Sequence, residues 1–334
     1  MNANRAPGGF TLLELLVAVT ITLVLAGLML SVVTNTLNLW HRTQDNSSTS
    51  AQAKLALDMI ERDLQTAVFR KDDGTWLAVD VHNTPVTLTS HGWLTTAALL
   101  KPATTESQRL LPDPVGGSSP RFSDGRFGFS GAWLRFITTT VAADGSLPTA
   151  VSYQIARRPL SGSITTTNPA EVRYTLFRSA VSAEYTLANG NEVTNPAYGS
   201  VATNPSASRS PATLTNPNNS DALATNVVDF GVWLYVRDSG GGLRQIFPAD
   251  NSDTSHAARD TGTAPDSSRF PDVADVMVRI LSEQGATLLS DIEKGGGRVA
   301  RPAECGTDAD WWWTVVETHS RVYLRRVEIK GASL

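Results

Sequence analysis

Residues 8–16 read Gly8-Gly9-Phe10-Thr11-Leu12-Leu13-Glu14-Leu15-Leu16, and they begin an apolar run that reaches Val33. Glu14 is the only formally charged residue between Phe10 and Trp40. An acid at the centre of a membrane helix costs about 2.5 to 3.5 kcal/mol on insertion scales, so such residues usually have a function and a partner. The stretch therefore predicts a membrane helix with one functional acid near its start.

The length of the apolar run matches a bilayer. Leu15–Val33 covers 19 residues, which as a helix span about 28 Å, close to a hydrocarbon core of roughly 30 Å. Arg5 is the only charged side chain before the run, and the positive-inside rule then places residues 1–9 in the cytoplasm. A cleaved secretory signal would have a shorter apolar region and an Ala-x-Ala-like site, which residues 31–34 do not offer. We expect a single-pass membrane protein.

The junction Gly9-Phe10-Thr11-Leu12-Leu13-Glu14 resembles the class III signal of type IV pilins and type II secretion pseudopilins. The resemblance implies that a prepilin peptidase cuts after Gly9 and methylates the new amino group of Phe10. Glu14 then becomes the fifth mature residue, the acid through which subunits of that family assemble. The implied partners are other pseudopilins or pilins, which pack through their N-terminal helices, and an inner-membrane assembly platform.

The chemistry of the junction agrees with this resemblance. Cleavage would leave a cationic amine on Phe10, and Glu14 lies four residues further along, on the same face of a helix. The acid then has a partner in its own chain or, as the family implies, in a neighbouring subunit. An acid that merely extends to the water at the interface is the alternative.

Helical periodicity returns after a polar stretch. Apolar residues recur at 4-3-4-3 spacing, at Ala53, Leu57, Ile60, Leu64 and Ala67, and Lys54 and Asp58 form an i,i+4 pair. We expect one helix from Thr11 to about Phe69, with a weak joint at Asn46–Ser50 and its second half packed on a head domain. The expected parts are a leader (1–9), a transmembrane helix (10–34), an amphipathic helix (35–70) and a periplasmic head (71–334).

The head shows the period-two pattern of strands. The expected strands are Trp76–Val81, Trp133–Thr140, Val151–Arg157, Glu171–Val181, Val227–Arg237, Leu243–Phe247, Ala274–Leu281 and Arg321–Ile329. Asp308–Ser320 fits a helix or a strand. Long polar stretches, expected as loops, cover Pro102–Arg126, Ala188–Asn226 and Pro248–Pro271. The predicted fold is α+β, with a mostly antiparallel sheet packed on the long helix.

Several head segments resemble the J-type minor pseudopilins. They are Val151–Ile155 with its tyrosine, the Leu-Phe-Arg segment Tyr174–Arg178, the Pro-led segment Phe270–Val276 and the helix end Ala56–Ala67. Ala188–Asn226 and Gly295–Asp310 depart from the pattern of that subclass.

Other function classes find little support in the 334 residues. The net charge is −4, with Lys and Arg scattered, so we predict no nucleic-acid binding. The five histidines, His41, His82, His91, His256 and His319, are far apart. Gly128–Gly131 lacks the spacing of a nucleophile elbow, and Lys294–Arg298 lacks that of a phosphate loop. We therefore predict no catalytic residues and no cofactor.

An acidic region leaves calcium open as an alternative. It contains Asp250, Asp253, Asp260, Asp266, Asp272 and Asp275, but their spacing matches no calcium-loop motif. The single cysteine, Cys305, is expected to be a packing or surface residue.

Three adjacent indoles, Trp311-Trp312-Trp313, are the most unusual local feature of the head. We expect at least one of them to be exposed or to cover a sheet edge, because three neighbours should not all enter one core. Two interpretations of the cluster stay open. It contacts a protein partner or a glycan, or it packs awkwardly in the core with one ring partly exposed.

Taken together, these patterns predict a pseudopilin or minor pilin that acts by assembly in a type II secretion pseudopilus or a related filament tip. A minor type IV pilin for adhesion or DNA uptake is an alternative. A membrane-tethered binding module that uses Trp311–Trp313 is another.

Overall fold

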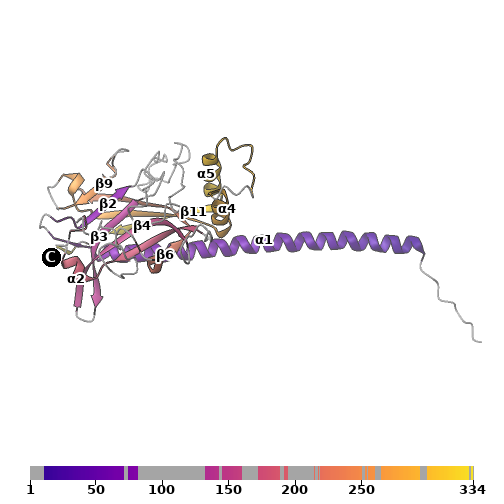
Figure 1. Cartoon of the computed structure of the whole chain (residues 1–334), viewed down its shortest axis with the longest axis horizontal. Helices are drawn as coiled ribbons and strands as arrows, with labels where there is room; N and C mark the ends of the chain where they lie inside the picture. The colour runs from indigo at the N-terminus through magenta and orange to yellow at the C-terminus, as the bar shows by residue number, and fades with distance from the viewer. Residues whose placement is uncertain are drawn as a thin grey trace, which may run out of the picture. The chain divides into compact units, whose positions relative to one another are not determined.

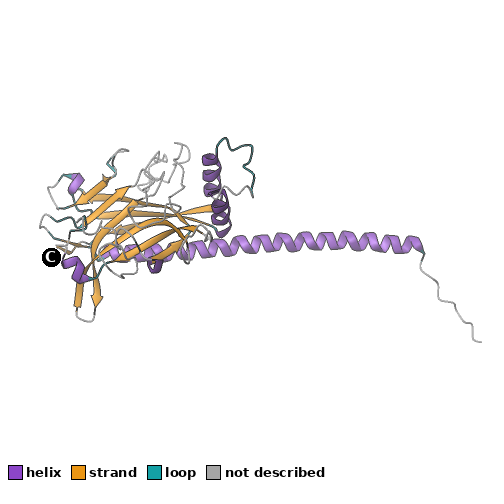
Figure 2. Cartoon of the chain, viewed as in Figure 1, coloured by secondary structure: helices purple, strands orange, loops and turns teal. Residues whose placement is uncertain are grey.

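The computed structural model describes residues 11–70, 74–81, 132–142, 145–159, 172–188, 192–194, 214, 217, 219–249, 253, 255–259, 265–293, 299–330 and 332–333. The chain divides into two compact units, Met1–Ser48 and Thr49–Leu334. Helix α1 (Leu12–Gln65) contributes residues to both units. Within the second unit the strands are mostly antiparallel (Figure 2). The predicted α+β class is therefore confirmed.

The second half of α1 buries the predicted apolar stripe. Ala53, Leu57, Ile60 and Leu64 are at most 5% exposed, and they join one hydrophobic cluster with residues of both large sheets. Charged residues lie between them, and Asp58 and Glu61 both pair with Arg325 of the sheet. The helical period therefore identifies the face that packs on the head.

One detail of the expected helix is wrong. The helix ends at Gln65 rather than near Phe69, because the Thr66 hydroxyl binds Thr138 at 2.7 Å and the Thr66 carbonyl accepts from Thr139 at 3.2 Å. The chain thus turns to run beside a strand. Asn46–Ser50 is part of the continuous helix, and the division between the two compact units falls within it, after Ser48. The weak joint expected there stays a prediction.

In the described residues the larger sheet has six strands in the order β6-β5-β4-β3-β2-β9, and each neighbouring pair is antiparallel. These strands are β2 (Leu77–Val81), β3 (Ala132–Ala142), β4 (Gly145–Pro159), β5 (Val172–Ala180), β6 (Ala222–Thr225) and β9 (Ser255–Ala258). A short helix, α2 (Ala183–Ala188), follows β5 and packs on β4.

The second sheet, within the part of the chain that the structure describes, has four antiparallel strands in the order β11-β10-β7-β8. They are β7 (Val227–Arg237), β8 (Leu243–Phe247), β10 (Val273–Leu281) and β11 (Ser320–Glu328). Between β10 and β11 the chain forms two helices, α4 (Glu283–Glu293) and α5 (Asp308–His319), which lie side by side (Figure 1). A short parallel pair joins β1 (Val68–Phe69) to β12 (Ala332–Ser333).

The expected loops contain structure that the sequence pattern did not reveal. Ala188–Asn226 contributes β6 and the fully buried Val193 and Leu214, and Pro248–Pro271 contributes β9. Leu214 accepts hydrogen bonds through its carbonyl from Ser152 and Gln154 of β4, both at 2.9 Å. Asp308–Ser320, left open by the sequence, is helix α5, started by a capping box between Thr307 and Asp310. Pro102–Arg126 lies outside the described residues.

A buried polar cluster fastens the end of α1 to the large sheet. The Asp63 carboxylate accepts a hydrogen bond from the Tyr153 hydroxyl of β4 at 2.6 Å and from Arg178 Nε of β5 at 2.7 Å. Burial, followed by the charge of Asp63, raises the pKa of Tyr153 well above its usual value, so this hydroxyl stays a donor. The Thr138 hydroxyl of β3 also donates a hydrogen bond to the backbone carbonyl of Asp63, at 2.9 Å.

Replacement of Asp63 by Ala should destabilise the head strongly. The change leaves the largely buried guanidinium of Arg178 without its carboxylate, and breaking such a pair costs about 3 to 5 kcal/mol. Urea unfolding of the full chain in detergent measures the loss. Arg62→Ala, at the exposed neighbouring position, is the matched control and should change the free energy of unfolding by less than about 0.5 kcal/mol. Equal effects of the two variants would contradict the clamping role of Asp63.

Polar contacts of its first residue, Glu283, attach helix α4 to the sheets. Glu283 accepts from Arg173 of β5 at 3.0 Å and from the Asn226 side-chain amide at 2.9 Å. Asn226 sits at the corner between β6 and β7 with a left-handed φ of 61°, a conformation that asparagine tolerates better than most residues. Partial burial acts to raise the pKa of Glu283, but the bonds from Asn226 and Arg173 outweigh it and lower the pKa.

The lowered pKa of Glu283 predicts a pH-dependent contribution to stability. The folded state favours the carboxylate, so the contribution is present above the ordinary glutamate pKa of about 4.3 and is lost as the pH falls through the lowered value. The difference in unfolding free energy between the wild type and Glu283→Gln should therefore shrink from about pH 6 to about pH 3. Glu317→Gln, at an exposed position of α5, serves as the control. A constant difference over this range would refute the assignment.

Candidate functional site

The first part of α1 is long and apolar enough to span a membrane. Leu12–Leu37 covers 26 residues, and its most apolar 18-residue window has a mean hydropathy of 2.6 and is not buried inside the protein. Leu12, Met29 and Leu30 are 83%, 73% and 69% exposed. A soluble protein would bury such side chains, whereas a bilayer of about 30 Å provides the apolar surroundings they require.

The polar side chains of this segment are satisfied by their own helix. Thr20, Thr22 and Thr36 donate to the carbonyls of Val17, Ala18 and Val32, each at 2.8 Å. Thr34 donates to Leu30 in the same way. Since hydrocarbon offers no hydrogen-bond partners, this arrangement lets the hydroxyls face lipid at low cost.

Glu14 forms a capping box with Thr11 at the start of the helix. Glu14 Oε2 accepts from the Thr11 amide and from the Thr11 hydroxyl, both at 3.0 Å, and the Glu14 amide donates to Thr11 Oγ1 at 3.3 Å. The Thr-x-x-Glu spacing signals such a box, and our sequence analysis did not use it. Gly9 and Phe10 lie outside the described residues, so cleavage, methylation and the pairing of Glu14 with the Phe10 amine stay predictions.

Comparison with protein families gives a match at this end of the chain. Residues 4–30 match the family model described as the prokaryotic N-terminal methylation motif. The chain carries a prepilin-type N-terminal motif. The match covers both sides of the Gly9–Phe10 junction and includes Glu14, and it supports a precursor of the pilin or pseudopilin type that prepilin peptidase cleaves. No curated protein and no solved structure gives a significant match to the chain.

The prepilin-type motif and the apolar helix together fit an inner-membrane anchor. The motif also implies assembly with other pilins. The J-type subclass, the secretion system and the periplasmic location of the head go beyond this match.

The expectation of an exposed tryptophan is wrong. Trp311, Trp312 and Trp313 are 9%, 2% and 1% exposed, and all three lie in α5. Neighbouring helix α4 and strand β11 pack on α5, and Trp312 makes an edge contact with Tyr174 of β5, with ring centroids 6.2 Å apart. A helix that is covered on several sides can bury consecutive side chains, so the three indoles pack as core. Contact of this cluster with a glycan or a partner stays a prediction.

Substitution of Trp312 by Ala should therefore act on stability. Loss of a buried indole costs about 3 to 5 kcal/mol, measured by urea unfolding of the full chain. Trp312→Phe keeps most of the ring volume and loses the bond from Nε1 to Glu293, which is 3.0 Å long, so its effect should be clearly smaller, at about 1 kcal/mol. Unchanged stability of the alanine variant would contradict the burial of this side chain.

In the described part of the chain, the acidic residues considered for calcium bind other groups of the protein. Asp250 and Asp260 lie outside the described residues. Among the others, Asp253 accepts from the Ala249 amide, Asp266 pairs with Arg244, Asp272 accepts from the Arg237 amide and Asp275 pairs with Arg326. The described part of the chain holds no group of three His, Cys, Asp or Glu residues placed to bind a metal ion. The prediction of no cofactor and the calcium alternative both stay untested.

The histidines in the described part of the chain belong to three different elements. His256 is buried in β9 with Nε2 3.0 Å from the Arg269 carbonyl, and burial lowers its pKa despite that bond. His319 ends α5, and His41 lies in α1. His82, His91, Gly128–Gly131 and Lys294–Arg298 fall outside the described residues. Cys305 is buried beside Thr314, with 3.8 Å between Sγ and Oγ1, as expected for a packing residue.

Proposed function

We propose that the chain is a pseudopilin or minor pilin subunit that acts by assembly. Prepilin peptidase cuts the precursor after Gly9 and methylates Phe10, and the mature chain enters a type II secretion pseudopilus or a related filament tip through its N-terminal helix. The observation that carries the proposal is the methylation motif at residues 4–30, which overlaps an unburied apolar helix at Leu12–Leu37. In this proposal the head is periplasmic, works by contact rather than catalysis, and uses no cofactor.

The capping box suggests how Glu14 takes part in assembly. In the single chain its carboxylate is satisfied by two neutral donors of Thr11. The amine of a processed neighbouring subunit is cationic, so it adds the attraction of a full opposite charge that the neutral donors of Thr11 lack. Glu14 would therefore exchange the Thr11 contact, or share it, with the amine of Phe10 from a neighbouring subunit. This exchange would fix the stagger between packed helices.

The J-type assignment is supported by where the resembling segments lie. The helix end, the tyrosine segment and the Leu-Phe-Arg segment contribute Asp63, Tyr153 and Arg178, which form the buried cluster. The Pro-led segment begins at Phe270, whose ring lies 4.9 Å from that of Phe69, just after α1. Segments dispersed over about two hundred residues thus surround one helix end, as expected for elements of one fold rather than chance matches.

The proposal is tested by the substitution Glu14→Val in a cell that contains the other subunits. Leader cleavage and membrane insertion should stay intact, because the helix becomes more apolar, while incorporation into cross-linked assemblies should fall at least about tenfold. That factor corresponds to about 1.4 kcal/mol, within the range of one charge-assisted hydrogen bond.

The matched control is Thr22→Val, which removes a hydroxyl that bonds only to the carbonyl of Ala18 among its described contacts. This variant should assemble like the wild type. Normal incorporation of Glu14→Val would refute the role of the acid in assembly.

A further inference from the structure

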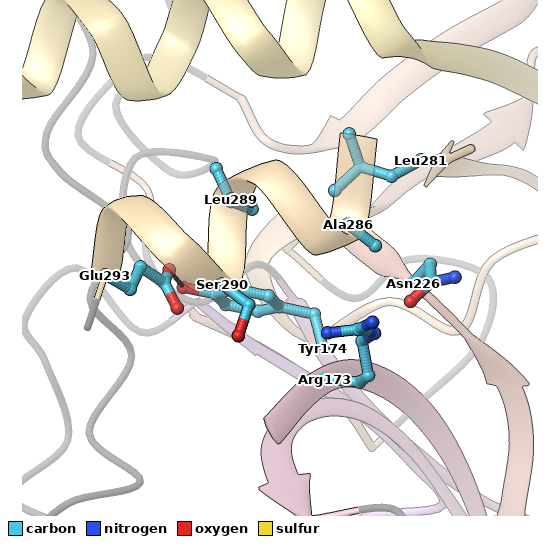
Figure 3. A pocket seen from close by; sticks show the side chains of 8 residues that line it. All are labelled: Arg173, Tyr174, Asn226, Leu281, Ala286, Leu289, Ser290 and Glu293. Atoms are coloured by element: carbon cyan, nitrogen blue, oxygen red, sulfur yellow. Dashed lines mark hydrogen bonds between the residues drawn. The ribbon is translucent and has the colours of Figure 1, made fainter. Parts of the chain in front are cut away.

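A small cavity lies where α4 meets the sheets. Figure 3 shows Ser290 reaching in from α4 and Asn226 from the corner between β6 and β7, with Arg173 of β5 between them. The centre of a water molecule can move within a volume of about 10 Å³ in this cavity. That is close to the minimum that holds one water molecule.

Two buried polar atoms face this cavity without a hydrogen-bond partner in the described part of the chain. Ser290 is 4% exposed and its Oγ is unpaired, and Asn226 is 5% exposed and its Oδ1 is unpaired. The amide nitrogen of Asn226 donates to Glu283 at 2.9 Å, which fixes the orientation of the oxygen. A buried polar atom without a partner loses the hydrogen bonds that it had in water, so such atoms in folded proteins usually bind an internal water.

The chemistry of the lining selects a neutral ligand. An anion would be attracted by Arg173. It would be repelled by the side-chain oxygen Oδ1 of Asn226 and by the carboxylate of Glu293, which are both hydrogen-bond acceptors. A metal ion would meet the guanidinium of Arg173. A ligand that donates to Asn226 and also accepts from Ser290 satisfies both unpaired atoms, and water does so within the available volume.

We propose that this cavity binds one internal water molecule, which donates to Asn226 Oδ1 and accepts from the Ser290 hydroxyl. The water joins α4 to the sheet corner, where Glu283 already binds Asn226 and Arg173. Through α4 it also supports α5, because Glu293 accepts from Trp312 at 3.0 Å and from Tyr174. The helix pair is then held on the large sheet by the direct polar contacts of Arg173 and Tyr174 with α4 and by one water-mediated contact.

A crystal structure of the full mature chain in detergent, at about 2 Å resolution, tests the proposal. It should show one solvent peak at about 2.6 to 3.2 Å from both Ser290 Oγ and Asn226 Oδ1. Crystals soaked in bromide should show no anomalous peak at this position. A dry cavity or a bromide peak would overturn the proposal.

The substitution Ser290→Ala distinguishes a hydrated cavity from a dry one in solution. If the hydroxyl binds water, its loss should lower Tm by about 2 to 4 °C. If the hydroxyl is buried without any partner, its removal should leave Tm unchanged or raise it, and either result would overturn the proposal. Gln284→Ala, at an exposed position of the same helix, is the control and should shift Tm by less than about 1 °C.

Discussion

The carboxylate of Asp63 is the interaction on which the arrangement of the head depends. It lies near the end of α1 and binds side chains from two adjacent strands, Tyr153 of β4 and Arg178 of β5. Apolar burial of Ala53, Leu57, Ile60 and Leu64 supplies most of the driving force, but it is non-directional. The directed bonds to Asp63 fix the rotation and the position of the helix along the sheet. The same helix begins at the prepilin-type motif, so one element carries both the membrane segment and the foundation of the head.

Much of the fold was predictable because its signals are local and periodic. The bounds of β7 and β8 agree residue for residue with the expected Val227–Arg237 and Leu243–Phe247. These strands alternate cleanly and are joined by a glycine-rich turn. β6 and β9 were missed, since four residues rich in Ala, Ser and Thr give no strand pattern. The burial of Trp311–Trp313 could not be foreseen either, because it depends on α4, β5 and β11 closing around one helix.

In the candidate site, too, contiguous signals could be predicted from the sequence and long-range contacts could not. The methylation motif is contiguous, so Gly9, Phe10 and Glu14 could be named from the sequence, and the Thr11–Glu14 capping box was also within reach of a spacing rule. The Asp63 cluster joins residues 90 and 115 positions apart. A single sequence does not reveal such pairs, because nothing in the local pattern specifies the partner across the fold. The segments that carry the J-type resemblance contained these residues, but the resemblance did not state that they touch.

The central claim is that Gly9–Phe10 is a processing site that creates the amine for assembly. Its most direct test is the intact mass of the chain produced with and without an active prepilin peptidase, with peptide sequencing of the new amino terminus. The account predicts loss of residues 1–9 and one added methyl group on the amino group of Phe10, only when the peptidase is active. An unshortened chain, or a cut near residue 34 by a different peptidase, would contradict it.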